Sequence, residues 1–255
     1  MGVNRKWIIG FEGGKRAVEL EHFCLRLAKE LGFPVPPTQA RNIGGTPVFI
    51  ARRYDRTSDG MRRIHQEDFC QALSHPPQRT YQNQGGPGPS EIVALLREHS
   101  SKPEADVWRF FDALAFHWLI AGTDAHAKNY SLMIAGRGQV QLAPLYDLIS
   151  SLPYPQLVDP RRAKLAMKIG GRYILRGKGG INGRSWEKCA EELGVDEEKA
   201  HQRIREMARR LPDCAAQVAT GLKEQGRIHD VVDHAVDALA KWTVACEKSP
   251  EEMRH

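Results

Sequence analysis

Three polar side chains in the middle of the chain, Asp124, Asn129 and Asp147, have the types and the spacing that metal or proton chemistry requires. They lie in the stretch from Gly122 to Leu148, which reads GTDAHAKNYSLMIAGRGQVQLAPLYDL. Carboxylate and amide oxygens bind hard cations such as Mg²⁺, and a carboxylate can accept a proton from an attacking hydroxyl. Aspartate and asparagine are also common turn formers, so the residue types alone leave a purely structural role open.

The segments around these residues predict how they are held. Residues 107–120 carry apolar side chains at nearly every helical angle, which is typical of a buried helix. Residues 130–143 read as a strand, the turn GRG and a second strand. A buried helix and a hairpin would therefore deliver the three polar side chains to one place.

The order of the three residues favours phosphoryl transfer. Asp124 and Asn129 have the D-x-x-x-x-N spacing of a protein-kinase catalytic loop, and Asp147 follows beyond a hairpin, as a metal-binding aspartate does in kinases. That spacing is common by chance. A transition-metal site on Asp124, His126 and His117 is disfavoured because no cysteine or carboxylate cluster completes it. His117 is predicted to be a hydrogen-bonded core residue.

The other expected elements alternate between short strands and helices in the first half and are mainly helices in the second. Helices are predicted over 17–31, ended by Gly32, over 64–74, over 91–99 with Ser90 as its cap, over 185–193 with Ser185 as its cap, over 197–211 and over 230–243. Strand pairs are predicted within 38–56 and around Gly170 and Gly171. Glycine and proline between 83 and 89 indicate an exposed loop.

Composition is that of an ordinary globular protein of 255 residues, with 27% charged and 41% hydrophobic residues. No apolar run reaches the roughly 20 residues that span a bilayer, and the first residues do not read as a secretory signal, so a cytoplasmic location is expected. The five cysteines are far apart in the sequence, which disfavours a disulfide framework or a zinc site, so we expect them to be small buried apolar residues. The net charge of +6 permits an anionic partner, and the basic stretch 161–184 is either a contact for an acidic target or a solvated face; direct nucleic-acid binding by this chain alone is not expected.

Several segments together resemble a known family, the HipA-like bacterial toxin kinases. They are ELEHFCLRLAKELGFPVPPT, VFIARRYDR, RIHQEDFCQALSHPPQRTYQ, GTDAHAKNYSLMI, LAPLYDLISSLPYP and LAMKIGG, in family order from about residue 17 to residue 194. The resemblance implies an α+β, mainly α, kinase-like fold with a reduced small lobe and a helical large lobe. It also implies ATP and Mg²⁺ as cofactors, serine or threonine of a protein as acceptor, an aminoacyl-tRNA synthetase as target class and a helix-turn-helix antitoxin as partner.

The resemblance assigns roles to individual residues. Asp124 matches the catalytic aspartate, and His126 and Lys128 lie in the same loop, where they could contact the γ-phosphate. Asn129 and Asp147 match the metal ligands. The hinge that would bind the adenine of ATP runs from Val48 to Tyr54 and includes Phe49, Ala51, Arg52 and Tyr54.

The chain departs from the family pattern near its start. Family members carry a Gly-rich loop and then a lysine upstream of the first helix, whereas Gly10 stands at the lysine position here, and Lys6 and Lys15 are out of register. We therefore expect residues 1–55 to be a truncated small lobe with the hinge and 56–255 to be the large lobe. Either a separately encoded small-lobe chain completes the site, or the chain is a catalytically impaired module that binds an antitoxin or another partner. Ser150 and Ser151 lie where an activation segment would be phosphorylated.

Overall fold

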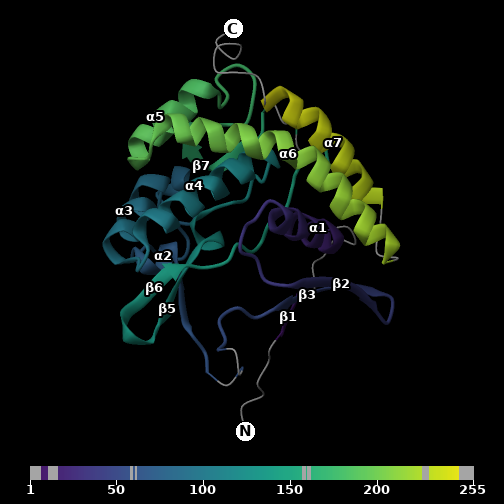
Figure 1. The fold of residues 1–255 in the computed structure, drawn as a ribbon, viewed down its shortest axis with the longest axis horizontal. Coiled ribbons are helices and arrows are strands. Elements are labelled where there is room, and N and C mark those ends of the chain that lie inside the picture. The colour runs from purple at the N-terminus through teal and green to yellow at the C-terminus, as the bar shows by residue number, and fades with distance from the viewer. Residues whose placement is uncertain are drawn as a thin grey trace.

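The computed structural model describes residues 7–10, 17–57, 60, 62–156, 159, 162–225 and 230–246. The described part is an α+β structure in which helices predominate (Figure 1). A small antiparallel sheet lies at one end of the molecule, and a layered group of helices forms most of the rest. The expected fold class, α+β and mainly α, is confirmed.

The small sheet is built from three strands, β1 Trp7–Gly10, β2 Thr38–Ile43 and β3 Thr46–Arg52, in the order β1-β3-β2. β2 and β3 form a hairpin whose two turn residues, Gly44 and Gly45, both have positive φ. Paired positive φ angles suit a tight two-residue turn, which explains two glycines at this point. Gly10 is paired with Phe49 across the sheet.

Helix α1, Ala17–Glu30, lies between the small sheet and the helices α6 and α7 (Figure 1). Because it is covered from both sides, even polar side chains such as Glu19, Glu21 and His22 are buried. The helix ends before Gly32, whose φ of 93° continues the chain in the left-handed region. The predicted helix and its glycine stop are confirmed.

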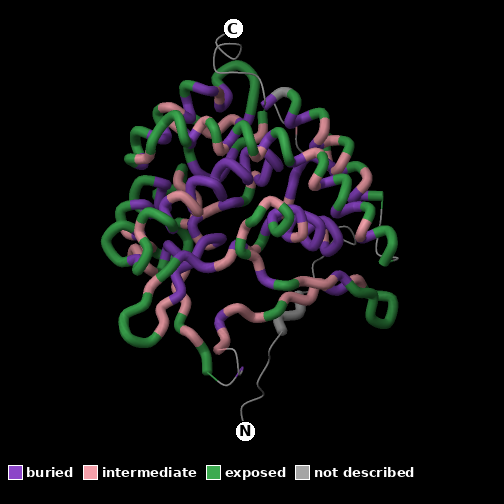
Figure 2. Tube along the Cα trace, in the orientation of Figure 1, coloured by how far each residue is buried: buried purple, intermediate pink, exposed green. Residues whose placement is uncertain are grey.

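The core is centred on α4, Pro103–Leu119, which is the predicted buried helix with one extra turn at its start. Phe110, Phe111 and Phe116 have no exposed surface, and Figure 2 shows the buried segments gathered at the centre of the molecule. Around α4 lie α3 Pro89–His99, α5 Gly183–Leu193, α6 Glu197–Glu224 and α7 Asp230–Cys246. All five cysteines are free, and all but Cys214 are buried, as expected.

Two further sheets flank this helical body. The first, in the order β4-β5-β6, contains β4 His65–Asp68, β5 Ser131–Ala135 and β6 Gln139–Leu142. The second pairs β7 Lys164–Ile169 with β8 Arg172–Ile174, as predicted around Gly170 and Gly171. The predicted GRG turn joins β5 to β6, so the hairpin before Asp147 is confirmed.

The prediction of a helix over 64–74 is mostly wrong. Residues 65–68 form β4, which pairs antiparallel with β5, and the helix α2 is only Phe69–Ala72. Asp68 ends the strand and caps the helix, because its carboxylate accepts the N–H of Gln71 at 2.9 Å. A partner strand far along the chain, in which Ser131 pairs with Asp68 and Ile134 with His65, therefore overrode the helical pattern of this segment.

Other helix ends also differ from the prediction, and α7 ends at Cys246 rather than Thr243. Gly88 rather than Ser90 is the N-cap of α3, and Asn182 rather than Ser185 is the N-cap of α5. α6 does not end at Leu211 but continues through Pro212 to Glu224. An interior proline costs about 3 kcal/mol in a helix, but α6 offsets this cost by burying apolar side chains on both sides of it: Ala208, Leu211, Ala215, Val218 and Leu222.

A buried carboxylate ties α4 to the hairpin. Asp106 is 2% exposed, and its Oδ2 accepts the Ser100 hydroxyl at 2.7 Å and the Leu142 N–H at 2.9 Å. Its Oδ1 accepts Nη1 of Arg109 at 2.8 Å, and Arg109 also donates to the carbonyls of Leu142 and Ala143. This network fixes the end of β6, from which the chain runs on to Asp147.

Across the described residues, no helix combines the length and the apolar character that crossing a bilayer takes.

Candidate active site

The loop after α4 carries Asp124 and Asn129 in a defined backbone conformation. Ala121 has a φ of 51°, which turns the chain sharply out of the buried helix. The His126 N–H then donates to the Asp124 carbonyl at 2.8 Å, and the Asn129 N–H donates to the His126 carbonyl at 2.9 Å. Backbone hydrogen bonds therefore hold this loop, and the side chains of Asp124 and Asn129 remain available for other contacts.

Asn129 and Asp147 meet directly. Nδ2 of Asn129 donates to Oδ2 of Asp147 at 2.6 Å, so the hairpin does bring the amide and the second carboxylate together. Asp147 has a φ of 56°, an uncommon conformation for a residue with a side chain, and such strain concentrates at functional sites. The side chain of Asp147 is partly open to solvent, but the protein around it still raises the pKa of its carboxyl. The negative charge of Asp124 raises this pKa further, whereas His126 and the hydrogen bond from Asn129 lower it.

Asn129 has an acceptor that fits a metal ion. Its Oδ1 is shielded from solvent and has no hydrogen-bond partner among the described residues. A buried acceptor without a partner is costly, and such atoms commonly point to water or an ion. Together with the carboxylate of Asp147, it forms an all-oxygen donor set of the kind that Mg²⁺ prefers. The residues present therefore fit the metal that the sequence predicted.

Asp124 lies close to this pair. Asp124 and Asp147 line one small cavity of about 220 Å³, together with His117 and Ser150. One oxygen of Asp124, Oδ1, accepts a hydrogen bond from the hydroxyl of Tyr81, a residue that sequence reasoning missed. Asp124 is otherwise exposed, so the cavity gives a reacting hydroxyl access to it.

A second cavity of about 580 Å³ lies beside the small sheet and contains the predicted hinge. Phe49, Ala51, Arg52 and Tyr54 all line it. Lys128 and Asp147 line it from the other side, so the loop and hinge predictions meet in one place. His126 does not line this cavity; its ring lies edge-on to Tyr81, with centroids 4.9 Å apart. Asp147 borders both cavities and connects them.

The floor of the hinge cavity is a polar network that sequence reasoning did not identify. Gln66 donates to the Ser131 hydroxyl at 3.0 Å, and that hydroxyl shares a 2.5 Å hydrogen bond with Tyr146. Tyr146 also donates to the Lys128 carbonyl at 2.7 Å, and its ring is stacked with Tyr54 at 6.1 Å. The sequence signals for these residues were weak: Tyr146 directly precedes Asp147, and Gln66 lies in a segment that resembles the HipA-like family.

The hinge itself is fixed by a buried ion pair. Asp55 is 4% exposed and binds Arg53 through both of its oxygens, while Nε of Arg63 lies 3.2 Å from its Oδ2. Burial works against ionisation of Asp55, but the guanidinium groups of Arg53, Arg63 and Arg56 outweigh it and hold the pKa of this carboxyl below its usual value. The cluster therefore holds the segment that borders the cavity in one conformation.

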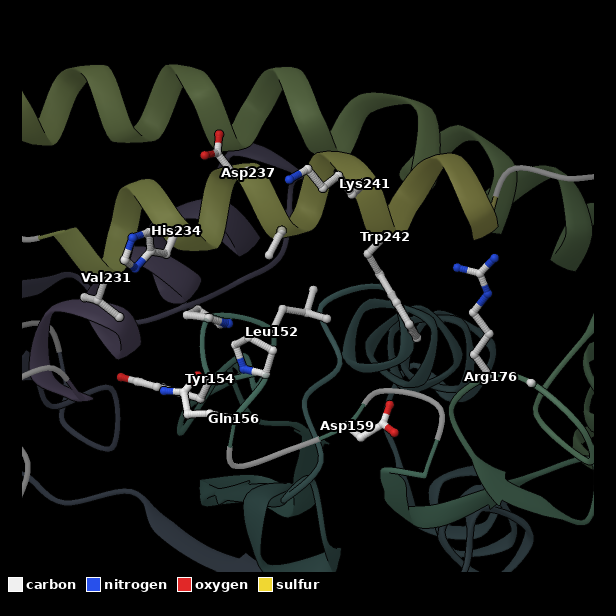
Figure 3. Close-up of a pocket in the computed structure, with 14 residues that line it drawn as sticks. Leu152, Tyr154, Gln156, Asp159, Arg176, Val231, His234, Asp237, Lys241 and Trp242 are labelled. Carbon is white, nitrogen blue, oxygen red and sulfur yellow. The ribbon is translucent and has the colours of Figure 1, made fainter.

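The largest of these cavities, about 1170 Å³, lies between α7 and a segment that contributes residues 152–156 and Asp159. Figure 3 shows Trp242 reaching from α7 towards this space, with Leu152 and Tyr154 on the facing segment. Tyr154 also lines the small cavity of Asp124 and Asp147, so the two spaces adjoin.

Two serines proposed for an activation segment are buried. Ser150 has no exposed surface and donates to the Ile120 carbonyl at 2.6 Å, and Ser151 donates to the Ala121 carbonyl at 2.7 Å. Their phosphorylation would require this segment to open.

His117 is buried as predicted, but its Nδ1 has no hydrogen-bond partner among the described residues, and burial lowers its pKa to about 4.

Comparison with known proteins gives relatives along most of the chain. A Sinorhizobium fredii protein named "Putative kinase Y4mE" is 36% identical over 225 residues, which cover 87% of this chain and 52% of the relative. The Shewanella oneidensis "Serine/threonine-protein kinase toxin HipA" is 27% identical over 227 residues, covering 83% of this chain and 50% of the toxin. The chain thus spans about half the length of these curated relatives.

Solved structures show the same fold. HipA from Shewanella oneidensis, in a complex with HipB and operator DNA, superposes with a TM-score of 0.84 at 23% identity, covering 98% of this chain and 60% of HipA. The Helicobacter pylori proinflammatory kinase CtkA superposes with a TM-score of 0.60 at 14% identity, covering 97% of this chain and 88% of CtkA. Residues 2–215 match the family model of the HipA-like C-terminal domain, and the chain therefore belongs to that family.

Proposed function

We propose that this chain transfers the γ-phosphoryl group of Mg²⁺-bound ATP to a serine or threonine hydroxyl of a protein. The observation that carries the proposal is the place of Asp147, which borders both the hinge cavity and the cavity of Asp124. A nucleotide in the first cavity would have its phosphates at the junction with the second. The acceptor hydroxyl would then lie on the side of Asp124.

Each residue of the loop has a distinct task in this proposal. Oδ1 of Asn129 and the carboxylate of Asp147 would hold Mg²⁺, which when bound neutralises charge on the phosphates. Asp124 accepts the proton of the serine or threonine hydroxyl. The oxygen of that hydroxyl bonds to the γ-phosphorus of ATP, while the bond between the γ-phosphorus and the β–γ bridging oxygen breaks and ADP leaves with that oxygen. Lys128 and Arg52 border the hinge cavity and supply positive charge there, and His126 lies beside Asp124.

Filling the hinge cavity should weaken ATP binding. Ala51→Trp adds a bulky ring at a side chain that lines the cavity, so we expect the dissociation constant for a fluorescent ATP analogue to rise by at least about tenfold. Ile43→Trp is the matched control, because Ile43 is 54% exposed at the tip of the same hairpin. Equal affinities in the two variants would show that the nucleotide binds elsewhere.

Replacing Asp147 by asparagine should stabilise the protein at neutral pH while removing a metal ligand. The pKa of Asp147 is raised in the folded state, so its ionisation above the ordinary value of 3.8 favours the unfolded state. We expect a higher Tm for Asp147→Asn than for wild type at pH 7, and a difference that shrinks towards pH 4, in the absence of Mg²⁺. A Tm gain that is the same at both pH values would contradict this assignment.

The large cavity along α7 is the side from which we propose that the protein substrate approaches, because Tyr154 borders both that cavity and the one around Asp124. An aminoacyl-tRNA synthetase is the proposed substrate class, and a helix-turn-helix antitoxin is the proposed partner. The latter is supported by the occurrence of HipB with the HipA that superposes on this chain. A location in the cytoplasm accords with both proposals.

The alternative is a split or catalytically impaired kinase that serves as a partner-binding module. It is favoured by Gly10, which offers no side-chain cation at the position of the family lysine in β1. Lys6 and Lys15 lie outside the described residues. In this alternative, residues 1–55 and 56–255 are an incomplete small lobe and a large lobe, and a separately encoded chain supplies the missing lobe.

The two functions are separated by one assay. Purified protein is incubated with γ-labelled ATP, with and without Mg²⁺, alone and together with any chain encoded directly upstream. Mg²⁺-dependent labelling of protein by the chain alone supports the complete kinase, and labelling only with the upstream chain supports the split one. Absence of labelling in every combination would overturn the kinase proposal and leave the binding module.

A further inference from the structure

Tyr81 comes from a loop far from the catalytic loop in sequence, yet its hydroxyl donates a hydrogen bond to Oδ1 of Asp124. The loop joins α2 to α3, and Tyr81 lies at the end of the segment RIHQEDFCQALSHPPQRTYQ, for which the resemblance to the family assigned no catalytic role. An acceptor hydroxyl must approach the same carboxylate. What Tyr81 does to Asp124 therefore bears on the proposed reaction.

The Tyr81 loop is anchored at several points. The carbonyl of Tyr81 accepts the N–H groups of Gln84 and Gly86, each at 2.9 Å. The side chain of Gln82 accepts the Lys168 N–H of β7 at 2.8 Å. At Gly86, a Cβ would lie 2.6 Å from the Arg79 carbonyl oxygen, so only glycine allows this close packing. These contacts hold Tyr81 in place.

The ring and the hydroxyl of Tyr81 are both engaged with the catalytic loop. The ring is edge-on to His126 at 87°, and the carbonyl of Thr80 accepts the Ala127 N–H at 3.4 Å. The hydrogen bond to Asp124, followed by burial, raises the pKa of Tyr81 to about 12. The phenol keeps its proton at neutral pH and remains a donor, so Oδ1 of Asp124 is engaged by Tyr81.

We propose that Tyr81 is a positioning residue: its hydroxyl holds Oδ1 of Asp124 and so directs Oδ2 towards the acceptor hydroxyl. This inference rests on the proposed function, because it assigns Tyr81 a part in the same reaction. A fixed carboxylate needs no reorientation before proton transfer. Loss of the hydroxyl should slow the chemical step and leave ATP binding intact.

The test compares Tyr81→Phe with Tyr173→Phe in the full chain. Both changes remove one hydroxyl, but Tyr173 lies on β8 and lines neither the Asp124 cavity nor the hinge cavity. We expect Tyr81→Phe to lower kcat for phosphoryl transfer from Mg²⁺-ATP by about tenfold or more, with KM for ATP within about twofold of wild type. Tyr173→Phe should leave both constants unchanged.

Several outcomes would overturn the inference. They are an unchanged kcat for Tyr81→Phe in a preparation whose wild type is active, a kcat loss accompanied by an equal rise in KM, and phosphotyrosine at position 81 in the wild type, which would make Tyr81 an acceptor. A second readout does not depend on activity. In protein labelled with ¹³C at tyrosine Cζ, the Tyr81 resonance should shift on Asp124→Asn, and the Tyr173 resonance should not.

These readouts separate the inference from the proposed function. An inactive wild type contradicts the kinase proposal and, with it, the catalytic part of Tyr81. An active wild type with an indifferent Tyr81→Phe contradicts the inference alone. An unshifted Tyr81 Cζ resonance in Asp124→Asn removes the contact itself.

Discussion

Asp124→Ala will lower the rate of phosphoryl transfer by about 10²- to 10⁴-fold, the range typical of removing a general base. The loss should appear in kcat, because Asp124 lines the small cavity with Asp147 but does not line the hinge cavity. Affinity for an ATP analogue should stay within about twofold of the wild-type value. The measurement is a transfer rate at saturating Mg²⁺-ATP combined with a nucleotide-binding titration.

A matched control for this change is Asp213→Ala, which removes an exposed carboxylate of α6 outside these cavities. It should leave the transfer rate and nucleotide affinity unchanged. If Asp124→Ala retained the wild-type rate, the role of base would have to be withdrawn from Asp124. If it lost nucleotide binding together with activity, the division of tasks between the two cavities would be wrong.

Asp106→Ala will destabilise the fold by about 3–5 kcal/mol in the free energy of unfolding, the cost typical of removing one partner from a buried ion pair. The change strips the Leu142 N–H and the Ser100 hydroxyl of their acceptor and leaves Arg109 without its carboxylate. Asp106 is 2% exposed, so water cannot replace it without opening the structure. Denaturant unfolding followed by far-UV circular dichroism measures the effect.

Glu104→Ala provides the comparison on the same helix. Glu104 lies in the first turn of α4, and its contact with Arg97 is 3.7 Å long and exposed, so its loss should cost less than about 1 kcal/mol. If both variants unfolded at the same denaturant concentration, the Asp106 network would not hold α4 to the hairpin. Since β6 leads on to Asp147, a loosened network should also weaken Mg²⁺-dependent nucleotide binding.

Elements with a strong local pattern could be predicted from the sequence. Three such patterns are the apolar spacing of α4, the glycine that follows α1 and the two glycines of the turn between β2 and β3. In each of them, the residues that set the conformation lie within a few positions of the element that they shape. Elements whose conformation depends on distant partners could not. Residues 65–68 became a strand because β5 pairs with them, and α6 continued through Pro212 because its apolar face is covered by other helices.

The candidate site divides in the same way. Asp124, Asn129 and Asp147 are near one another in the chain, and a single hairpin suffices to bring two of them into contact, so their spacing was informative. Tyr81 and Gln66 carried no such signal, because their contacts with Asp124 and Ser131 span 43 and 65 residues. The hinge residues were found only through resemblance to the HipA-like family.

The sequence by itself determined which residues can bind a metal or take a proton, since that depends on side-chain chemistry and on spacing within one loop and one hairpin. Only the tertiary structure decided that Asp147 borders two cavities, that the hinge faces Lys128 and that Tyr81 holds Asp124. These facts depend on how the small sheet, α4 and the loop before α3 pack together. Packing is the sum of many weak contacts between segments distant in the chain, and no local pattern records it.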